Sequence, residues 1–368
     1  RIDHFGLGYV LFRLTSDVEK LPFPMAPVGA MGMTALADDA GEADVRAESR
    51  AMGVSDQTFD TAFRGLEPDR SLPDLLLPGQ KRPGGPGQAE FTKTPLEYLG
   101  LASLMNLADK GRQLAQRHAT TLAAIERELG VDRHILLAIW GRETAFGTYK
   151  LPHPVVRVLA TQAYLGRRKE SFRKELLFAL KMIEDGILKP AVMKASWAGA
   201  IGLTQFLPSE YYDLAYDMDK DGKKDIWNSI PDALASAANQ LKAKGWTPGQ
   251  PWGYEVRLPA STTCLAEGQP NARPASDWVK AGVVRADGKP IPQPRLSEPA
   301  FLLTPGGSYG PVFLVFENFM VLKRYNFADL YAVFVGHLAD RMAGGGAVRD
   351  RPIRAAVGAL GPRRGRRG

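Results

Sequence analysis

The sequence contains a single cysteine, Cys264, among its 368 residues. One cysteine excludes an intramolecular disulfide framework and any cysteine-based zinc site, so neither can stabilise this fold. Cys264 also lies far from the N-terminus, which excludes it as the attachment point of an N-terminal lipid anchor.

Long apolar runs are missing as well. No stretch approaches the roughly 18 consecutive apolar residues that a membrane-spanning helix needs. Residues 1–15 have neither an initiator Met nor the layout of a signal peptide, and we interpret the chain as trimmed at its start. Export is therefore not readable from the sequence itself.

The chain carries a formal net charge of +7, which makes a polyanion or an anionic surface a natural class of partner. Much of this charge, however, lies in the C-terminal arginines at positions 363, 364, 366 and 367. A terminal run of this kind is typical of a solvated tail, so we predict no nucleic-acid partner.

Hydrophobic periodicity and capping residues predict a mainly helical protein. We expect a helical pair over 43–65 with Ser55 as an N-cap, and a tight hairpin in which Gly130 ends one helix and Asp132 begins the next. The first helix of the hairpin is predicted over about 114–129. Further predicted helices cover about 171–184, 232–244 and 328–342.

The remaining segments predict loops and a small sheet, which makes the expected class α+β. Pro and Gly are dense over 73–87, which indicates a surface loop, and residues 249–311 favour loops and short strands. We expect residues 1–42 to be poorly ordered, residues 43–343 to form the folded domain, and residues 344–368 to form a disordered tail rich in Gly and Arg.

One predicted helix carries a carboxyl group into the interior. The run Ile135 to Trp140 is apolar on every face, which predicts a buried helix, and Glu143 shares a stripe with Leu136, Ile139 and Trp140. Desolvation there would raise the pKa of the carboxyl, as a general acid requires. A solvated glutamate paired with Arg142 is the commoner arrangement, so this position alone assigns no role.

Several separated blocks give Glu143 a context. They are 138–144 (AIWGRET) with Phe146-Gly147, 160–168 (ATQAYLGRR), 196–209 (SWAGAIGLTQFLPS), 217–239, Gly245-Trp246, Tyr325-Asn326 and Tyr331-Ala332. In order and spacing these blocks resemble the B-type lytic murein transglycosylases, glycoside hydrolase family 103. The resemblance spans roughly residues 43–344.

The resemblance implies a lysozyme-like helical catalytic domain, with an additional helical region and a small sheet, whose cleft binds the glycan of bacterial cell walls. Glu143 would be the sole catalytic acid. Ser196, Gln205 and Phe206 would line the sugar subsites, and Tyr98, Tyr325 and Tyr331 would be cleft tyrosines. This chain departs from the family at Gln240, where a tyrosine is common.

An ordinary glycosidase uses two carboxylates, and the blocks fix only one. This favours a lytic transglycosylase, in which the glutamate protonates the glycosidic oxygen and the muramoyl 6-hydroxyl then closes a 1,6-anhydro ring. A hydrolytic muramidase and a non-catalytic glycan-binding scaffold are the alternatives, and the presence of Glu143, Ser196 and Gln205 together argues against the scaffold.

As in the family, we expect peptidoglycan strands as the substrate and cell-wall synthesis or remodelling proteins as further partners. The family also implies a monomer, a periplasmic or membrane-associated location in the envelope, and chemistry that requires no cofactor.

The block over 217–232 begins like a calcium-binding EF-hand loop. Asp217, Asp219 and Asp221 occupy positions one, three and five, and Gly222 occupies position six. Position twelve is Asn228 rather than an acidic residue. The family resemblance implies that Asp232 completes a structural calcium site and that Lys223 contributes its carbonyl. An aspartate-rich turn flanked by lysines is the alternative.

Overall fold

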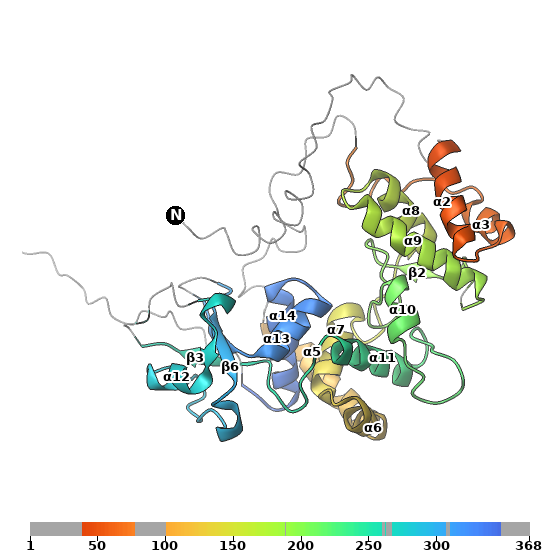
Figure 1. The fold of residues 1–368 in the computed structure, drawn as a ribbon. Coiled ribbons are helices and arrows are strands. Elements are labelled where there is room, and N and C mark those ends of the chain that lie inside the picture. The colour runs from red at the N-terminus through yellow and green to blue at the C-terminus, as the bar shows by residue number, and fades with distance from the viewer. Residues whose placement is uncertain are drawn as a thin grey trace, which may run out of the picture.

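The chain folds into helices that flank a small antiparallel sheet (Figure 1). The structure is a computed structural model that describes residues 39–77, 101–187, 189–259, 262, 267–306 and 310–346. The predicted mainly helical α+β class is confirmed. Among the described residues, no helix combines the length and the apolarity needed to cross a membrane.

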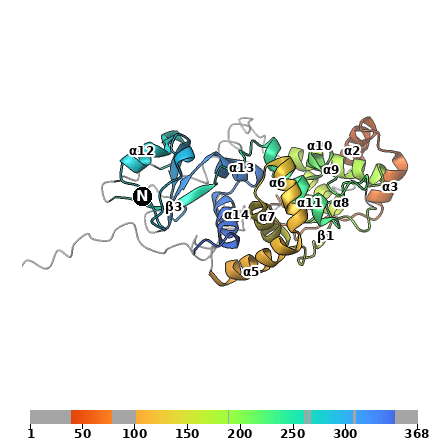
Figure 2. The same ribbon diagram turned by 90° about the horizontal axis from the view of Figure 1, so that it is seen from below.

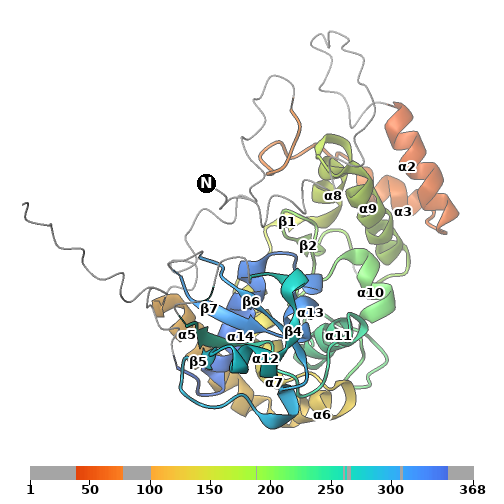
Figure 3. The same ribbon diagram turned by 60° about the vertical axis from the view of Figure 1, so that its left-hand side comes forward.

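One group of helices comes mainly from the first half of the chain and lies apart from the sheet in every view (Figure 3). Its members are α2 (Asp39–Ala51), α3 (Asp56–Phe63), α8 (Val155–Leu165), α9 (Lys169–Glu184) and α10 (Pro208–Leu214). Ser55 caps α3 as predicted, because its side chain accepts a hydrogen bond from the amide of Thr58. These helices share a core that includes Phe59, Leu176 and Phe206.

A second group surrounds α7. It consists of α5 (Leu101–Arg117), α6 (Ala119–Leu129), α7 (Arg133–Thr144), α11 (Ile230–Ala243), α13 (Glu317–Tyr325) and α14 (Asp329–Met342). The predicted caps are confirmed: Gly130 ends α6 with a φ of 73°, and Asp132 accepts from the amides of His134 and Ile135 at the start of α7. The predicted helix from Leu114 is wrong at its start, because His118 leaves helical geometry and separates α5 from α6.

The sheet lies between α12 (Ala275–Lys280) on one face and the second helical group on the other (Figure 2). Its antiparallel order is β4 (Arg273–Pro274), β6 (Pro299–Leu303), β7 (Val312–Val315), β3 (Gly253–Arg257) and β5 (Val284–Arg285). Side chains alternate between the faces of a strand. Phe313 and Val315 therefore join the core around α7, whereas Leu314 packs with Trp278 of α12.

Four further elements are short. Strands β1 (His153–Pro154) and β2 (Lys194–Ala195) pair in antiparallel fashion, and β2 leads directly into the block that begins at Ser196. The sheet region also contains single turns of 3₁₀-helix at Gln269–Asn271 and Gln293–Arg295.

Helix α14 places an ionisable side chain, His337, in the core. Burial lowers the pKa of this imidazole to about 4, and the nearby charge of Arg341 acts in the same direction. In the unfolded chain, histidine titrates near pH 6.5. Between these two pH values the unfolded chain binds a proton at His337 that the folded protein does not bind, so protonation favours unfolding.

We therefore predict that His337 makes the protein less stable as the pH falls from about 6.5 to 4, by up to about 3 kcal/mol. Replacing His337 with Gln, which does not titrate, should flatten this part of the stability curve. Chemical denaturation of both proteins between pH 4 and 7.5 measures the difference. Parallel curves for the two proteins would contradict the prediction.

Candidate active site

Glu143 lies in the last turn of α7, two residues after the buried run 135–141. Its own side chain is half-buried, so the carboxyl stands where a buried helix reaches the surface. The helix ends there because Ala145, Phe146 and Gly147 all have positive φ values, of 49°, 59° and 75°. This reversal folds Phe146 back over Gly141, where any Cβ would clash with its ring at 2.7 Å.

Thr144 ties the end of α7 to the glycine-rich block. Its hydroxyl donates to the carbonyl of Leu203 at 2.7 Å and accepts from the amide of Gly147 at 3.2 Å. The block can approach because Gly199 and Gly202 have positive φ and no side chain; a Cβ on them would clash with Leu159 and Ile226. The residue next to Glu143 is thereby fixed to the segment of the expected sugar-binding residues.

Two stacked tyrosines hold the other side of the site. The Tyr331 hydroxyl, on α14, donates to Oε1 of Glu143 at 2.5 Å, and the Tyr325 hydroxyl, at the end of α13, donates to the carbonyl of Thr204 at 2.5 Å. The two rings lie 6.4 Å apart and nearly parallel. Burial raises the pKa of both hydroxyls well above the usual value for tyrosine, and the charge of Glu143 adds to this effect. Both therefore remain hydrogen-bond donors.

The predicted sugar-binding residues fall into three classes. Ser196 and Gln205 are half-buried at the two ends of the glycine-rich turn, and Gln205 adopts a left-handed backbone with a φ of 58°. Phe206 is completely buried, and its backbone exchanges two hydrogen bonds with Ile201, so its side chain packs in the core and a sugar contact through it stays a prediction. Tyr98 lies outside the described residues.

One polar cluster was missed by the sequence analysis. Glu210 of α10 accepts hydrogen bonds at 2.8 Å from both Lys244 and Gln240, which lie one turn apart at the end of α11. Gln240 is the residue where a tyrosine was expected. Its proximity to a carboxylate and a lysine could not be read from the sequence, because 30 residues separate it from Glu210.

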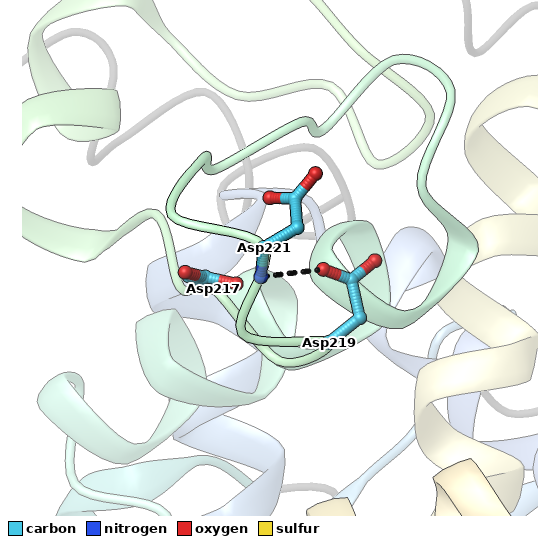
Figure 4. Close-up of side chains that lie close together, drawn as sticks. All are labelled: Asp217, Asp219 and Asp221. Atoms are coloured by element: carbon cyan, nitrogen blue, oxygen red, sulfur yellow. Dashed lines mark hydrogen bonds between the residues drawn. The ribbon is translucent and has the colours of Figure 1, made fainter.

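The aspartate-rich loop gathers three of its four predicted carboxylates. Oxygens of Asp217, Asp219 and Asp221 lie within 4.8 Å of one another, and the amide of Asp221 bonds to Asp219 (Figure 4). Ligand oxygens lie about 2.4 Å from a bound calcium, so this separation is within reach of one shared ion. In addition, Oδ1 of Asp217 is buried without a hydrogen-bond partner.

Asp232 binds backbone amides of the same loop. Its carboxylate accepts from the backbone amides of Met218, Asp219 and Asp225, so both oxygens already clamp the loop. It does not belong to the group of three, so its part in a calcium site stays a prediction from the family resemblance. The amide of Lys223 bonds to Asp221, which places the Lys223 carbonyl in the same turn.

Comparison with known proteins identifies what this arrangement is similar to. The family model described as a transglycosylase SLT domain matches residues 37–340. The membrane-bound lytic murein transglycosylase B of Escherichia coli is 31% identical over 228 residues, which cover 58% of this chain and 58% of that protein. The match therefore spans less than two thirds of that relative's length.

Solved structures show the same likeness in three dimensions. SltB3 of Pseudomonas aeruginosa, in complex with NAG-NAM-pentapeptide, superposes with a TM-score of 0.76 at 39% identity, over 85% of this chain and 81% of its own. Slt35 of Escherichia coli, in complex with calcium, gives a TM-score of 0.58 at 27% identity, over 68% and 78%. These neighbours confirm the predicted lysozyme-like fold.

The hydrogen bond from Thr144 to Leu203 generates a prediction about stability. Replacing Thr144 with Val keeps the shape but leaves the Leu203 carbonyl without its donor, which should cost about 1–3 kcal/mol. Replacing Thr144 with Ser retains the hydroxyl and should cost less. Unfolding by denaturant ranks the two variants, and a valine variant as stable as the serine variant would show that the bond contributes nothing.

Proposed function

The chain belongs to the transglycosylase SLT domain family, and on that premise we propose that it is a lytic transglycosylase of peptidoglycan with Glu143 as its acid and base. The observation that carries this assignment is the placement of Glu143 at the end of a buried helix, with Oε1 held by Tyr331. A half-buried carboxyl oriented by a neutral donor suits proton transfer to and from a bound sugar.

In the first step Glu143 donates a proton to the oxygen of the bond between N-acetylmuramic acid and N-acetylglucosamine. Oε1 accepts from Tyr331, so the transferred proton belongs on Oε2. The glycosidic C–O bond breaks, the leaving sugar keeps the proton as its hydroxyl, and positive charge develops at the anomeric carbon of the muramoyl ring.

In the second step the carboxylate acts as base. It takes the proton from the muramoyl 6-hydroxyl, whose oxygen attacks the anomeric carbon of the same ring and closes a 1,6-anhydro bridge. Glu143 ends the cycle protonated, as it began. The nucleophile belongs to the substrate and benefits from a high effective molarity, which explains how one carboxyl group suffices.

The surrounding residues would orient the glycan. We assign direct sugar contacts to Ser196 and Gln205. Tyr325 would contact the sugar with the face of its ring, and its hydrogen bond to the Thr204 carbonyl would hold the ring in place. Tyr98 keeps this role as a proposal from the resemblance alone. From the family resemblance we also propose that the protein acts as a monomer in the periplasm or at an envelope membrane, alongside cell-wall remodelling proteins.

Product analysis tests the reaction. We predict that digestion of purified sacculi yields muropeptides with 1,6-anhydro-muramoyl ends, because the 6-hydroxyl takes the place of water. Mass spectrometry separates the two outcomes, since an anhydro end is lighter than a reducing end by one water. Reducing-end products would instead identify a hydrolytic muramidase.

The variant Glu143→Gln is the control for this experiment. The amide keeps the size of the side chain and can still accept from Tyr331, but it cannot supply the proton. Turnover should fall by at least the roughly 10²–10⁴-fold typical of one acid–base group. Activity within a few-fold of the unaltered protein would remove Glu143 from this role.

We also propose that the loop over 217–225 binds a structural calcium ion. Asp217, Asp219 and Asp221 would hold the ion with the Lys223 carbonyl, and the ion would offset most of the charge of the three clustered carboxylates and satisfy the buried Oδ1 of Asp217. The calcium complex of Slt35 shows that one structural neighbour binds this ion. In this chain, the neighbouring lysines at 220, 223 and 224 argue for modest affinity.

Calcium should accordingly raise the melting temperature progressively, since a ligand that binds only the folded state stabilises it by RT ln(1 + [L]/Kd). Changing Asp217 and Asp221 to Asn should abolish this shift and leave turnover at low temperature almost unchanged. Asp213→Asn, an exposed aspartate on α10, is the matched control and should keep the shift. An unchanged melting temperature at millimolar calcium would mean that the loop is an aspartate-rich turn and not a calcium site.

A further inference from the structure

Helix α10 begins at a buried polar contact that fixes its orientation. Both oxygens of Glu175, on α9, are used: one accepts from the Ser209 amide at 2.9 Å and the other from the Ser209 hydroxyl at 2.8 Å. Glu175 and Ser209 are both buried, and Pro208 precedes Ser209 in the first turn of α10. The next residue, Glu210, therefore projects from a backbone with little freedom.

Glu210 uses one oxygen for each of two partners. Oε1 accepts from the ammonium group of Lys244 and Oε2 from the amide nitrogen of Gln240. The lysine and the carboxylate are each mostly covered, with 18% and 25% of their side chains exposed. Because Lys244 compensates the charge, a carboxylate is tolerated between α10 and α11.

The carboxylate decides which way the Gln240 amide faces. An ionised carboxylate only accepts hydrogen bonds, so the NH₂ end must point to Glu210 and the carbonyl must point away. Gln240 is only 3% exposed, and its carbonyl oxygen has no hydrogen-bond partner. A buried acceptor without a donor is destabilising, so a donor that reaches this oxygen, from a bound sugar or from a water molecule, would stabilise the cluster.

The same cluster reaches the active site through Tyr325. Arg324, the residue before it, donates to the Lys244 carbonyl at 3.0 Å. Helix α11 also packs against α13, which ends at Tyr325, and the charge of Glu210 contributes to raising the pKa of the Tyr325 hydroxyl.

We propose that Glu210 is a positioning residue for the glycan: it orients Gln240 so that a carbonyl acceptor remains for a hydroxyl or acetamido N–H of the sugar, and it holds α10 and α11 beside Tyr325. This proposal deepens the proposed function and rests on it. Glu210 takes no part in proton transfer, because its two oxygens are engaged by Lys244 and Gln240.

The first test is Glu210→Gln. In this variant the side-chain carbonyl of residue 210 accepts from Lys244, and its NH₂ group faces Gln240. Gln240 must then rotate its amide to accept from that group, so its free end becomes a donor instead of an acceptor. We expect KM for a GlcNAc-MurNAc tetrasaccharide to rise about tenfold, with kcat within about threefold. Calorimetry of the same sugar on Glu143→Gln, with and without Glu210→Gln, should show a matching loss of affinity.

A swapped pair separates positioning from stability. Glu210→Gln combined with Gln240→Glu keeps a glutamine bonded to a glutamate, and it pairs the new carboxylate with Lys244 one turn further along α11. The melting temperature should return towards that of the unaltered protein while KM stays raised. A KM that returns together with the melting temperature would mean that the cluster serves stability alone.

The chain also contains a matched control. Glu298, beside the sheet, accepts from the Gln250 amide at 3.1 Å and from Arg295. It therefore has the same kinds of partner as Glu210, a glutamine amide and a cationic side chain. Glu298→Gln should lower the melting temperature and leave KM unchanged. The proposal is overturned if Glu210→Gln leaves both KM and sugar affinity within twofold, or if Glu298→Gln raises KM equally. Absence of anhydro products from the unaltered protein would overturn the proposed function instead, and the calorimetry would still decide the role of Glu210.

Discussion

The hydrogen bond between Tyr331 and Glu143 joins residues that are 188 positions apart and imposes a constraint on the structure around it. Helix α7 is buried over almost all of its length and places the carboxyl of Glu143 at its last turn. Helix α14 packs along α7, which brings the Tyr331 hydroxyl within 2.5 Å of that carboxyl. The sheet in turn supports α14, since Trp252, next to β3, donates to Asp340 and packs over Gly336. Packing at a distance from Glu143 thus determines how its carboxyl is oriented.

Local signals in the sequence predicted much of this scaffold. Ser55, Gly130 and Asp132 cap helices where expected, because a cap depends on contacts only a few residues away. The apolar run before Glu143 correctly predicted a buried helix. The break at His118 was missed, since a helical pattern continues through it on both sides.

Contacts between distant residues account for what the sequence could not supply. The association of Glu210 with Gln240 and Lys244 depends on how α10 packs against α11, and no spacing rule connects them. Phe206 and Asp232 were placed by resemblance at contact positions, yet the core encloses the former and loop amides occupy the latter.

The order of elements along the chain has a consequence for biosynthesis. Glu143 belongs to the first half of the chain, whereas the hydroxyl that orients it belongs to α14, the last helix among the described residues. Between them the chain builds the helices α8 to α10, α11 and the whole sheet. A nascent chain or a folding intermediate without α14 therefore holds the carboxyl but lacks its orienting donor. For the proposed cleavage of a cell-wall polymer, the site would thus be complete only after the last described helix has been made and packed.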